Sequence, residues 1–362
     1  MPSFLEGIRD SIGPSVFDYG LSPLLKIFFV MFLFALPIIT YMVLAERKIL
    51  GFIQMRTGPN RVGPWGILQP IADVAKLLVK EDVVPRYAIK WAYIMAPGII
   101  VAPMFVLFAV VPFGPPGDGE SLDFFITDLN VGALYIVAVA TLGVYGIIIA
   151  GWASNSKFSL MGGLRSAAQM VSYEVPQGLA VVGPLMLAGS MSLVTIVEAQ
   201  RDAHVWYVFP QLLAFFVFSV AGVAEANRNP FDLPEAESEL VGGFHTEYTG
   251  MRFALFFLAE YGNMILISAV ATTLFLGGWL RPFPSVAALA FLDGAWLPFG
   301  LVMIVPMLWF SAKITVFLFV YIWFRGTFPR YRFDQLMALG WKWLLPMALA
   351  NIFLTGLVKL LV

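Results

Sequence analysis

Four charged side chains interrupt stretches of this sequence that are otherwise apolar. Glu174, Glu225 and Glu260 contribute carboxyl groups, and Lys313 contributes an amine. A charge at the centre of a membrane helix costs about 2.5–3.5 kcal/mol on insertion scales, so such a residue usually faces protein or water. A row of buried carboxyl groups can take up and release protons near neutral pH. We interpret the four as a proton-linked set, and the alternative is that they form structural polar contacts between helices.

Residues close to Glu174 and Glu225 in the sequence add detail to that interpretation. Glu174 lies two residues before Pro176, which cannot donate a backbone hydrogen bond and therefore leaves a polar gap beside the carboxyl group. Arg228 follows Glu225 by three residues, a spacing that predicts an ion pair on one helix face.

The composition indicates an integral membrane protein. Of the 362 residues, 60% are hydrophobic and 12% are charged, whereas soluble domains carry about a quarter charged residues. With no Cys, the chain cannot form a disulfide, a thiolate zinc site or a cysteine-ligated iron–sulfur cluster. The two histidines, His204 and His245, lie in polar segments, which argues against a transmembrane haem. The formal charge of −1 indicates no nucleic-acid partner. If the protein takes part in electron transfer, the electrons must therefore be carried elsewhere.

Eight apolar runs are long enough to cross a bilayer, because about 20 helical residues span its core. They lie near 24–44, 91–111, 131–152, 166–189, 206–226, 251–277, 297–324 and 341–361. No linker or convincing internal repeat divides the chain, and residues 1–23 lack the features of a signal peptide. The sequence thus predicts one all-α domain over residues 1–362, a bundle of about eight tilted transmembrane helices with short amphipathic surface helices.

The distribution of basic residues predicts the orientation of the bundle. The first, third, fifth and seventh connections hold 16 of the 22 Lys and Arg residues, and the other side, with both termini, holds four. The positive-inside rule places the odd connections in the cytoplasm and both termini on the outer side.

Two of the odd connections have features of their own. In the first, residues 65–79 alternate apolar and polar positions at helical spacing, which predicts an amphipathic helix along the membrane surface or, equally, under a soluble partner. The fifth, residues 227–250, is acidic but also rich in large apolar residues. Asp232 and Glu235 have the spacing of a helix start. We expect this loop to fold inward, or against a partner, and to line a polar cavity.

Several of these stretches closely resemble one family of membrane subunits of respiratory complex I, the H-type subunits, which are the counterparts of mitochondrial NADH dehydrogenase subunit 1. The resemblance covers nearly the whole chain. It rests on long motifs: Glu46-Arg47-Lys48, Gly58–Pro64, Gly151–Lys157, Ser172-Tyr173-Glu174, Glu225–Arg228, Pro230–Glu237, Glu247-Tyr248 and Tyr331–Leu336.

The resemblance implies a membrane protein that holds a quinone cavity, docks the peripheral electron-transfer arm and couples quinone reduction to proton translocation. It implies no catalytic residue of its own. The implied quinone-cavity residues are Arg47, Phe52, Arg56, Asp232, Phe244, Glu247 and Tyr248. The implied proton pathway contains Glu174, Glu225, Asp232, Glu235, Glu237, Glu239 and Glu260. The implied docking and loop residues are Glu46, Asn60, Arg61, Arg228, Arg332 and Asp334.

The resemblance also implies a substrate and a set of partners. The substrate would be ubiquinone or menaquinone, with no metal, haem or flavin bound by this chain. The partners would be iron–sulfur subunits of the peripheral arm, small and antiporter-like membrane subunits, and lipid, in a bacterial inner membrane or an equivalent one. One departure is Thr141, at a third-span position that is Glu in some relatives. Here water or another residue would have to replace that carboxylate.

Two other functions remain open from the sequence. A membrane anchor of an energy-converting hydrogenase shares this architecture without quinone, but the basic, aromatic first connection and the complete acidic loop favour the quinone enzyme. A stand-alone secondary transporter would predict paired repeats with broken helices, which the sequence does not show.

Overall fold

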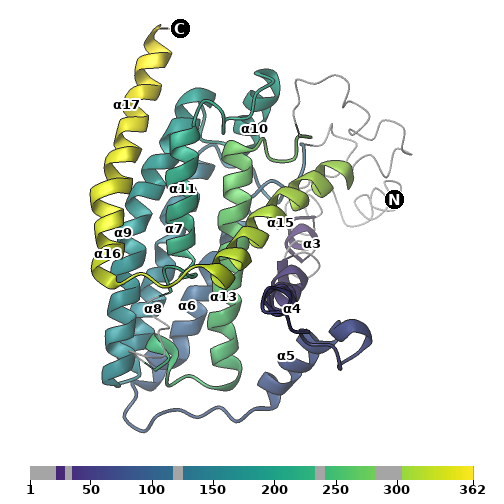
Figure 1. The fold of residues 1–362 in the computed structure, drawn as a ribbon, viewed down its shortest axis with the longest axis vertical. Coiled ribbons are helices and arrows are strands. Elements are labelled where there is room, and N and C mark those ends of the chain that lie inside the picture. Colours follow the sequence, from purple (N-terminus) through teal and green to yellow (C-terminus); the bar gives the residue numbers. More distant parts are fainter. Residues whose placement is uncertain (1–21, 29–34, 117–124, 233–240, 283–303, 362) are drawn as a thin grey trace.

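The computed structural model describes residues 22–28, 35–116, 125–232, 241–282 and 304–361, and the regular structure in these ranges is helical (Figure 1). In chain order the elements are α3 (Ser22–Phe28), α4 (Leu36–Ile53), η3 (Pro64–Gly66), α5 (Gln69–Val79), α6 (Lys90–Phe108), α7 (Gly132–Ala140), α8 (Leu142–Ala153), α9 (Lys157–Ala188), α10 (Leu193–Asp202), α11 (Leu212–Glu225), η4 (Gly243–His245), α13 (Gly250–Phe275), α15 (Ile304–Thr327), α16 (Phe333–Ala338), η6 (Leu339–Leu344) and α17 (Leu345–Leu361). The all-α membrane fold predicted from the sequence is confirmed.

The number of membrane crossings is a separate question from the fold class. Within the described residues, five helices are long and apolar enough to span a bilayer, and a sixth span results if the bent pair α9 and α10 counts as one. Each of the eight predicted runs overlaps at least one described helix, but α11 has only 14 residues. Parts of the first and seventh runs lie outside the described residues. The predicted count of eight therefore stays a prediction.

The longest helix, α9, lies at the centre of the packing. It runs for 32 residues and contacts α8, α11 and α17, while α6 packs against α8 and α13. Small residues bring these helices close. A Cβ on Gly146 of α8 would lie 2.2 Å from Cγ1 of Ile100 on α6, and one on Gly162 of α9 would lie 2.6 Å from Cα of Gly243 in η4. Close backbone approach at small residues is typical of helix contacts in membranes.

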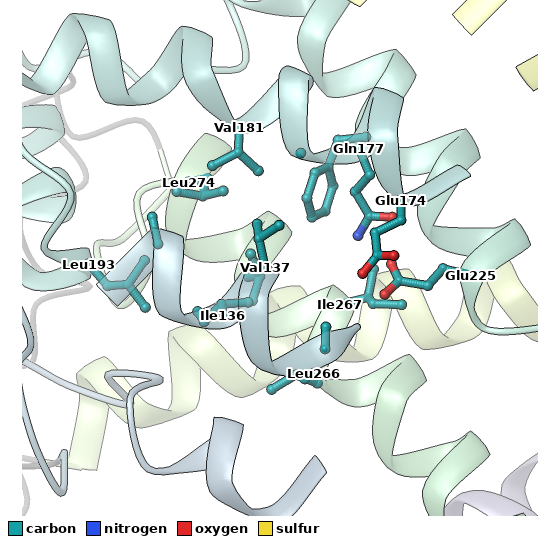
Figure 2. Close-up of a pocket in the computed structure, with 15 residues that line it drawn as sticks. Ile136, Val137, Glu174, Gln177, Val181, Leu193, Glu225, Leu266, Ile267 and Leu274 are labelled. Atoms are coloured by element: carbon teal, nitrogen blue, oxygen red, sulfur yellow. The ribbon is translucent and has the colours of Figure 1, made fainter. Parts of the chain in front are cut away.

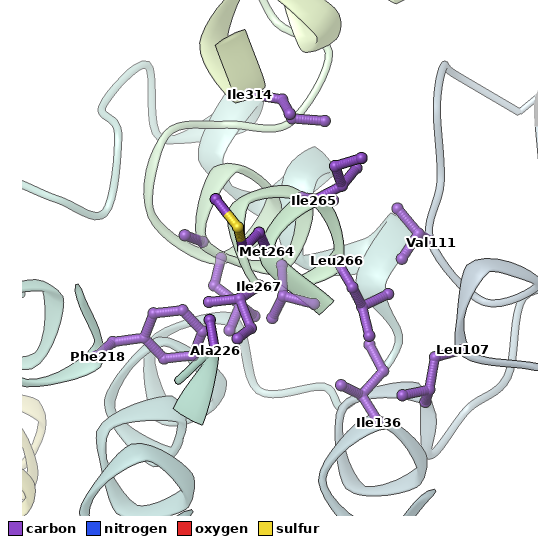
Figure 3. Close-up of a cluster of buried hydrophobic side chains, with 14 of the residues drawn as sticks. Leu107, Val111, Ile136, Phe218, Ala226, Met264, Ile265, Leu266, Ile267 and Ile314 are labelled. Carbon is purple, nitrogen blue, oxygen red and sulfur yellow. The ribbon is translucent and has the colours of Figure 1, made fainter. Parts of the chain in front are cut away.

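Large apolar side chains fill the space between the helices (Figure 3). Leu107 of α6, Ile136 of α7, Phe218 of α11, Ile265 of α13 and Ile314 of α15 belong to one buried cluster. This core fixes α11 and α13 side by side, and these are the helices that carry Glu225 and Glu260.

The connections gather at the ends of the bundle as the basic residues predicted. The backbone nitrogen of Val83 donates to Thr249 Oγ1 at 3.0 Å, Ser159 Oγ donates to the Phe244 carbonyl at 2.8 Å, and the Tyr331 nitrogen donates to the Pro230 carbonyl at 3.1 Å. These contacts join the first, third, fifth and seventh connections at one end, here called the arginine-rich end. The other end, with α10 and the C-terminus of α17, is called the opposite end (Figure 1).

The surface helix of the first connection is shorter than predicted. Residues 65–79 were expected to be helical throughout, but Trp65 has φ 56° and ψ 20°, so a 3₁₀ turn precedes α5 and the helix starts at Gln69. Ile71 and Leu78 on its apolar face are exposed, and Asp73 accepts a bond from Arg47 of α4 at 2.9 Å. The amphipathic helix itself is confirmed.

Candidate functional site

A buried ion cluster joins α4, α13 and α15 at the arginine-rich end. Arg325 donates to Glu46 Oε1, and the Tyr261 hydroxyl donates to Glu46 Oε2 at 2.8 Å. Arg228, in the turn after α11, brings its Nε to 3.0 Å from Glu260 Oε1 and its NH1 to 3.7 Å from Glu46 Oε1. The chain thereby places two carboxylates and two guanidinium groups around one tyrosine.

Arg228 is the centre of this cluster, and its partners differ from the predicted one. Burial by itself lowers the pKa of Arg228, but Glu260, Tyr261 and Glu46 together raise it above its ordinary value, so the guanidinium stays charged. Its guanidinium carbon also lies 4.2 Å from the centre of the Tyr261 ring. The predicted pair with Glu225 on one helix face is wrong, because α11 ends at Glu225 and Arg228 turns toward Glu260.

The turn after α11 leads into the acidic loop and is tied to the last connection. The amide of Asn229 donates to the Phe328 carbonyl at 2.9 Å. Asp232 is buried and accepts a bond from Arg330 at 3.1 Å. Burial raises the pKa of Asp232, and Arg330, Arg325 and Arg228 act in the opposite direction. The predicted inward folding of this loop is confirmed at Asp232. Its predicted helix start with Glu235 lies outside the described residues.

A cavity of about 40 Å³ lies between α7, α9, α11 and α13, with Glu174 and Glu225 on its wall (Figure 2). In Figure 2 the two carboxyl groups point toward one another, with Gln177 beside them. Apolar side chains such as Ile136, Val181 and Leu274 form the rest of the wall. A cavity of this volume holds about two or three waters, and its polar corner is where water would bind.

A second cavity of about 40 Å³ also has Glu225 on its wall. Its wall includes Glu225, Glu260, His245 and Asn263, from α11, α13 and η4. Glu225 is the carboxyl group that lies on the walls of both cavities. Its Oε2 is buried and has no hydrogen-bond partner among the described residues. The three glutamates predicted as a set therefore line two cavities that meet at Glu225.

The amino-acid sequence matches a known family. A model of the NADH dehydrogenase family matches residues 25–356. The chain belongs to the NADH dehydrogenase family. The NADH-quinone oxidoreductase H-type subunit 1 of Geobacter metallireducens is 49% identical over 343 residues, which cover 94% of this chain and 96% of that protein. Its counterpart in Geobacter sulfurreducens is 50% identical over 353 residues, which cover 94% of this chain and 95% of that protein. The H-type subunit of Brevibacillus brevis is 52% identical over 323 residues, covering 89% of each chain.

These relatives make the chain a multi-pass membrane protein of the H type in complex I, as the motifs indicated. Apart from Asp232, which pairs with Arg330, the residues that the resemblance assigns to the quinone cavity fall into two groups in the structure. The first lies on and after α4, where Arg47 is bonded to Asp73 of α5, Phe52 is 70% exposed, and Arg56 bonds Gln54. This group lies at the surface of the arginine-rich end, beside the amphipathic helix.

The second group lies in an aromatic cluster around η4. Tyr248 stacks on Tyr93 of α6 with ring centres 4.1 Å apart, and Phe244 packs edge-on against Phe256 at 5.4 Å. The Tyr93 hydroxyl donates to the Glu247 carbonyl at 2.7 Å. Phe244 also lines the second cavity, so this group connects the fifth connection to the carboxylates.

The remaining predicted residues are spread over the surface or fall outside the described ranges. Asn60, Arg61, Arg332 and Asp334 are exposed, and Arg332 lies 3.9 Å from Asp334. Glu46 and Arg228, predicted with them, are buried in the ion cluster instead. Glu235, Glu237 and Glu239 lie outside the described residues.

Two polar residues of the predicted spans lie apart from the cavities. Lys313 lines neither cavity; its Nζ donates to the carbonyls of Leu276, Gly278 and Leu280 at the opposite end. Its partners are backbone carbonyls and none of the three glutamates, which favours a structural role for Lys313. Thr141, between α7 and α8, donates its hydroxyl to the Ala138 carbonyl at 2.7 Å within its own span.

Sequence reasoning missed the uncharged polar residues of the site. Gln169 and Gln177 lie on α9 on either side of Glu174, and His245 and Asn263 lie on the wall of the second cavity. Two glutamines within a predicted span were a usable signal, because a buried amide must find hydrogen-bond partners. Nothing in the sequence pointed to His245.

Proposed function

We propose that this chain is the quinone-chamber subunit of an NADH:quinone oxidoreductase, which docks the peripheral arm and couples quinone reduction to proton translocation through its buried carboxyl groups. The observation that carries the proposal is the meeting of two cavities at Glu225, with Glu174 on one side and Glu260 on the other. The names of the relatives support the reaction, since each is a subunit of NADH-quinone oxidoreductase.

The arrangement suggests how charge moves through the protein. Quinone reduced near the fifth connection would change the charge and the proton demand close to Asp232 and the Arg228 cluster. Arg228 already contacts Glu260, and Glu260 shares a cavity with Glu225. A proton shift at one carboxyl group therefore changes the electrostatic environment of the next, and Glu174 extends the row. Neighbouring subunits would complete transport, and the electron donors belong to the peripheral arm, so the isolated chain catalyses nothing.

The surface features support the docking part of the proposal. Phe52, Trp65 and Tyr87 are exposed on the first connection, and Arg332 is exposed on the last. Exposed aromatic residues together with arginine are typical of a protein interface. The odd connections would face the cytoplasm and the peripheral arm, in a bacterial inner membrane, with the opposite end on the outer side.

Replacing Glu225 with Gln tests the coupling role. The substitution keeps the size and hydrogen-bonding capacity of the side chain but removes the group that ionises, so we expect the complex to assemble normally. Inhibitor-sensitive NADH:quinone turnover should fall by about a hundredfold or more, in the range that loss of a proton-transfer group costs. The measurement is turnover and proton uptake in native membranes, divided by the amount of assembled complex.

Glu198→Gln is the matched control, because Glu198 lies on α10 at the opposite end and pairs with Arg201 at 3.9 Å. It should retain wild-type turnover. Normal turnover in Glu225→Gln would remove Glu225 from the pathway. Purification of the wild-type chain from its membranes tests the partners: flavin- and iron–sulfur-bearing NADH-oxidising subunits are expected, and a nickel–iron hydrogenase arm or a lone protein would overturn the proposed function.

A further inference from the structure

One face of α9 holds the turn that links Glu225 to the acidic loop. Ser166, Gln169, Met170 and Tyr173 are spaced by three or four residues and therefore share that face. The Asn227 amide reaches Ser166 Oγ at 3.4 Å and Met170 Sδ at 3.9 Å, and the Tyr173 ring packs against Phe231 with centres 5.6 Å apart. The turn thus rests along two helical turns of α9.

Gln169 lies in the middle of this face and makes the direct polar contacts. Its side chain is fully buried, and Nε2 lies 2.8 Å from the Ala224 carbonyl, 3.1 Å from Asn227 Oδ1 and 2.7 Å from the Phe231 carbonyl. Ala224 directly precedes Glu225, and Phe231 directly precedes Asp232. One amide group therefore connects the backbone positions next to both acids.

The orientation of that amide follows from its partners. Two of the three groups around Nε2 are backbone carbonyls, which can only accept hydrogen bonds, so the nitrogen must face them. The turn requires stabilising contacts, because Asn227 has φ 49°, in the left-handed region that non-glycine residues adopt infrequently. Without the donor, the buried Phe231 carbonyl would lose its partner and the Ala224 carbonyl would keep only its bond from the Asn227 nitrogen at 3.2 Å, which favours a different turn.

We propose that Gln169 is a positioning residue for the carboxylate pathway: it holds the Glu225–Asp232 turn against α9, so that Glu225 faces Glu174 and both cavities. The proposal rests on the proposed function, because it assigns Gln169 a role in setting the geometry of that pathway. Gln169 does not line either cavity and touches no reacting group, so it acts through the turn.

The chain offers a matched control in Gln200. Gln200 on α10 is also fully buried, and its Nε2 likewise faces three acceptors, all of them backbone carbonyls, of which Thr273 is the nearest at 3.0 Å. Its Oε1 accepts a bond from the Tyr207 nitrogen at 3.1 Å. Gln169 Oε1, by contrast, has no hydrogen-bond partner among the described residues, so replacing Gln200 breaks at least as many buried hydrogen bonds. Gln200 lies at the opposite end, away from the carboxylates.

The first test compares Gln169→Leu with Gln200→Leu in the assembled complex in native membranes. Leucine has a similar size and no donor, so both variants should lower thermal stability. Turnover per assembled complex should fall about tenfold or more in Gln169→Leu, because the turn leaves its active geometry when the buried hydrogen bonds are lost. In Gln200→Leu it should change by less than about twofold. Equal losses in the two variants, or no loss in Gln169→Leu, would overturn the proposal.

The second test remains decisive if Gln169→Leu does not assemble. In Gln169→Glu, the protonated side chain carries one O–H donor for a carbonyl, whereas the carboxylate carries none and is repelled. Turnover of this variant, relative to wild type, should rise at least about threefold from about pH 8 to about pH 6. Gln200→Glu should follow the wild-type profile, and a flat ratio for Gln169→Glu would contradict the positioning role.

The pH comparison isolates the substituted position. The titratable and charged groups that face the turn from the surrounding elements include Glu46, Tyr173, Glu174, Glu225, Arg228, Asp232, Glu260, Tyr261, Arg325, Arg330 and Tyr331, and they are the same in every variant. Failure of this inference also differs from failure of the proposed function. If Glu225→Gln keeps full turnover, the pathway is wrong; if Glu225→Gln is inactive and Gln169→Leu behaves as Gln200→Leu, only the role of Gln169 is wrong.

Discussion

The two ends of the bundle both bury polar side chains, but they arrange them differently. At the opposite end Lys313 donates to three backbone carbonyls, and Gln211, Asn351 and Thr355 bond one another, with the Asn351 amide 2.7 Å from Gln211 Oε1 and the Gln211 amide 2.8 Å from Thr355 Oγ1. These groups hold helices together.

At the arginine-rich end the buried polar groups carry more charge, since Glu46, Arg228 and Glu260 lie in one cluster. Buried atoms with no hydrogen-bond partner among the described residues include Glu225 Oε2, Gln177 Oε1, Arg228 NH2 and Asp232 Oδ1. Glu225 and Gln177 lie on the wall of the first cavity. Since buried polar groups are nearly always satisfied, these atoms predict ordered water at these positions.

The difference shows why a charge inside a predicted span is not enough to assign a function. Lys313 and Glu225 interrupt apolar runs in the same way in the sequence. The partners differ, because carbonyl groups surround Lys313, whereas Glu225 borders two cavities and other acids. Substitutions at the two ends can therefore test whether polar residues at the opposite end affect only stability and those at the arginine-rich end also affect turnover.

The largest expected effect follows from removing Arg228. In Arg228→Leu, Glu260 loses its closest cation in a buried site, and breaking a buried ion pair in this way costs about 3–5 kcal/mol. We expect little assembled complex, measured by native gel electrophoresis of solubilised membranes. Arg330→Leu is the control, because Arg330 is 42% exposed and its loss should leave most of the complex intact.

A double variant makes the test of the cluster more specific. Replacing both Arg228 and Glu260 with Leu removes both buried charges, and such an exchange is often neutral for stability. Assembly should therefore recover relative to Arg228→Leu while turnover stays absent. If Arg228→Leu assembles as well as wild type, the ion cluster does not hold α4, α13 and the turn together.

Replacing Lys313 tests the opposite end. In Lys313→Met the three carbonyls after α13 lose their shared donor, and we expect a loss of about 3 kcal/mol in stability. Turnover per assembled complex should stay at the wild-type level. The measurements are the thermal inactivation midpoint and NADH:quinone turnover. A loss of turnover comparable with that of Glu225→Gln would return Lys313 to the proton-linked set that the sequence suggested.

The helical fold was predictable because each span needs only a long apolar run, and the runs are continuous in the sequence. The arginine-rich end was predictable from the positions of Lys and Arg. The partner of Arg228 was not, because the spacing to Glu225 assumed that the helix continues beyond residue 225, and α11 ends there. Only tertiary packing brings Glu46, from the first span, beside an arginine almost two hundred positions later.

The carboxyl groups of the site were found because a charge stands out in an apolar run. The amides and His245 were not found, because a Gln or His in a span or loop is usually a satisfied structural residue. Their importance depends on which carbonyl or cavity they face, and that information lies in contacts between distant segments, such as Gln169 with Phe231.

The smallest expected effect concerns His245, which lies in the aromatic cluster around η4. Its ring packs against Phe253 with centres 5.4 Å apart and against Phe244 at 5.1 Å. Burial lowers the pKa of His245 to about 4, from 6.5. Between these two values the unfolded segment binds more protons than the folded one, so stability rises with pH and is lost as pH falls below about 6.5.

From about pH 7 to about pH 5, protonation of His245 in the unfolded segment lowers the free energy of unfolding of the fifth connection by at most about 2 kcal/mol. In His245→Gln the side chain keeps a polar group but cannot be protonated, so the acid sensitivity should disappear. Hydrogen–deuterium exchange of residues 241–249 at both pH values, corrected for intrinsic rates, measures it. His204→Gln, exposed at the opposite end, should keep the wild-type response. An unchanged response in His245→Gln would mean that another group controls how this connection opens in acid, and Asp232 would be the next to replace.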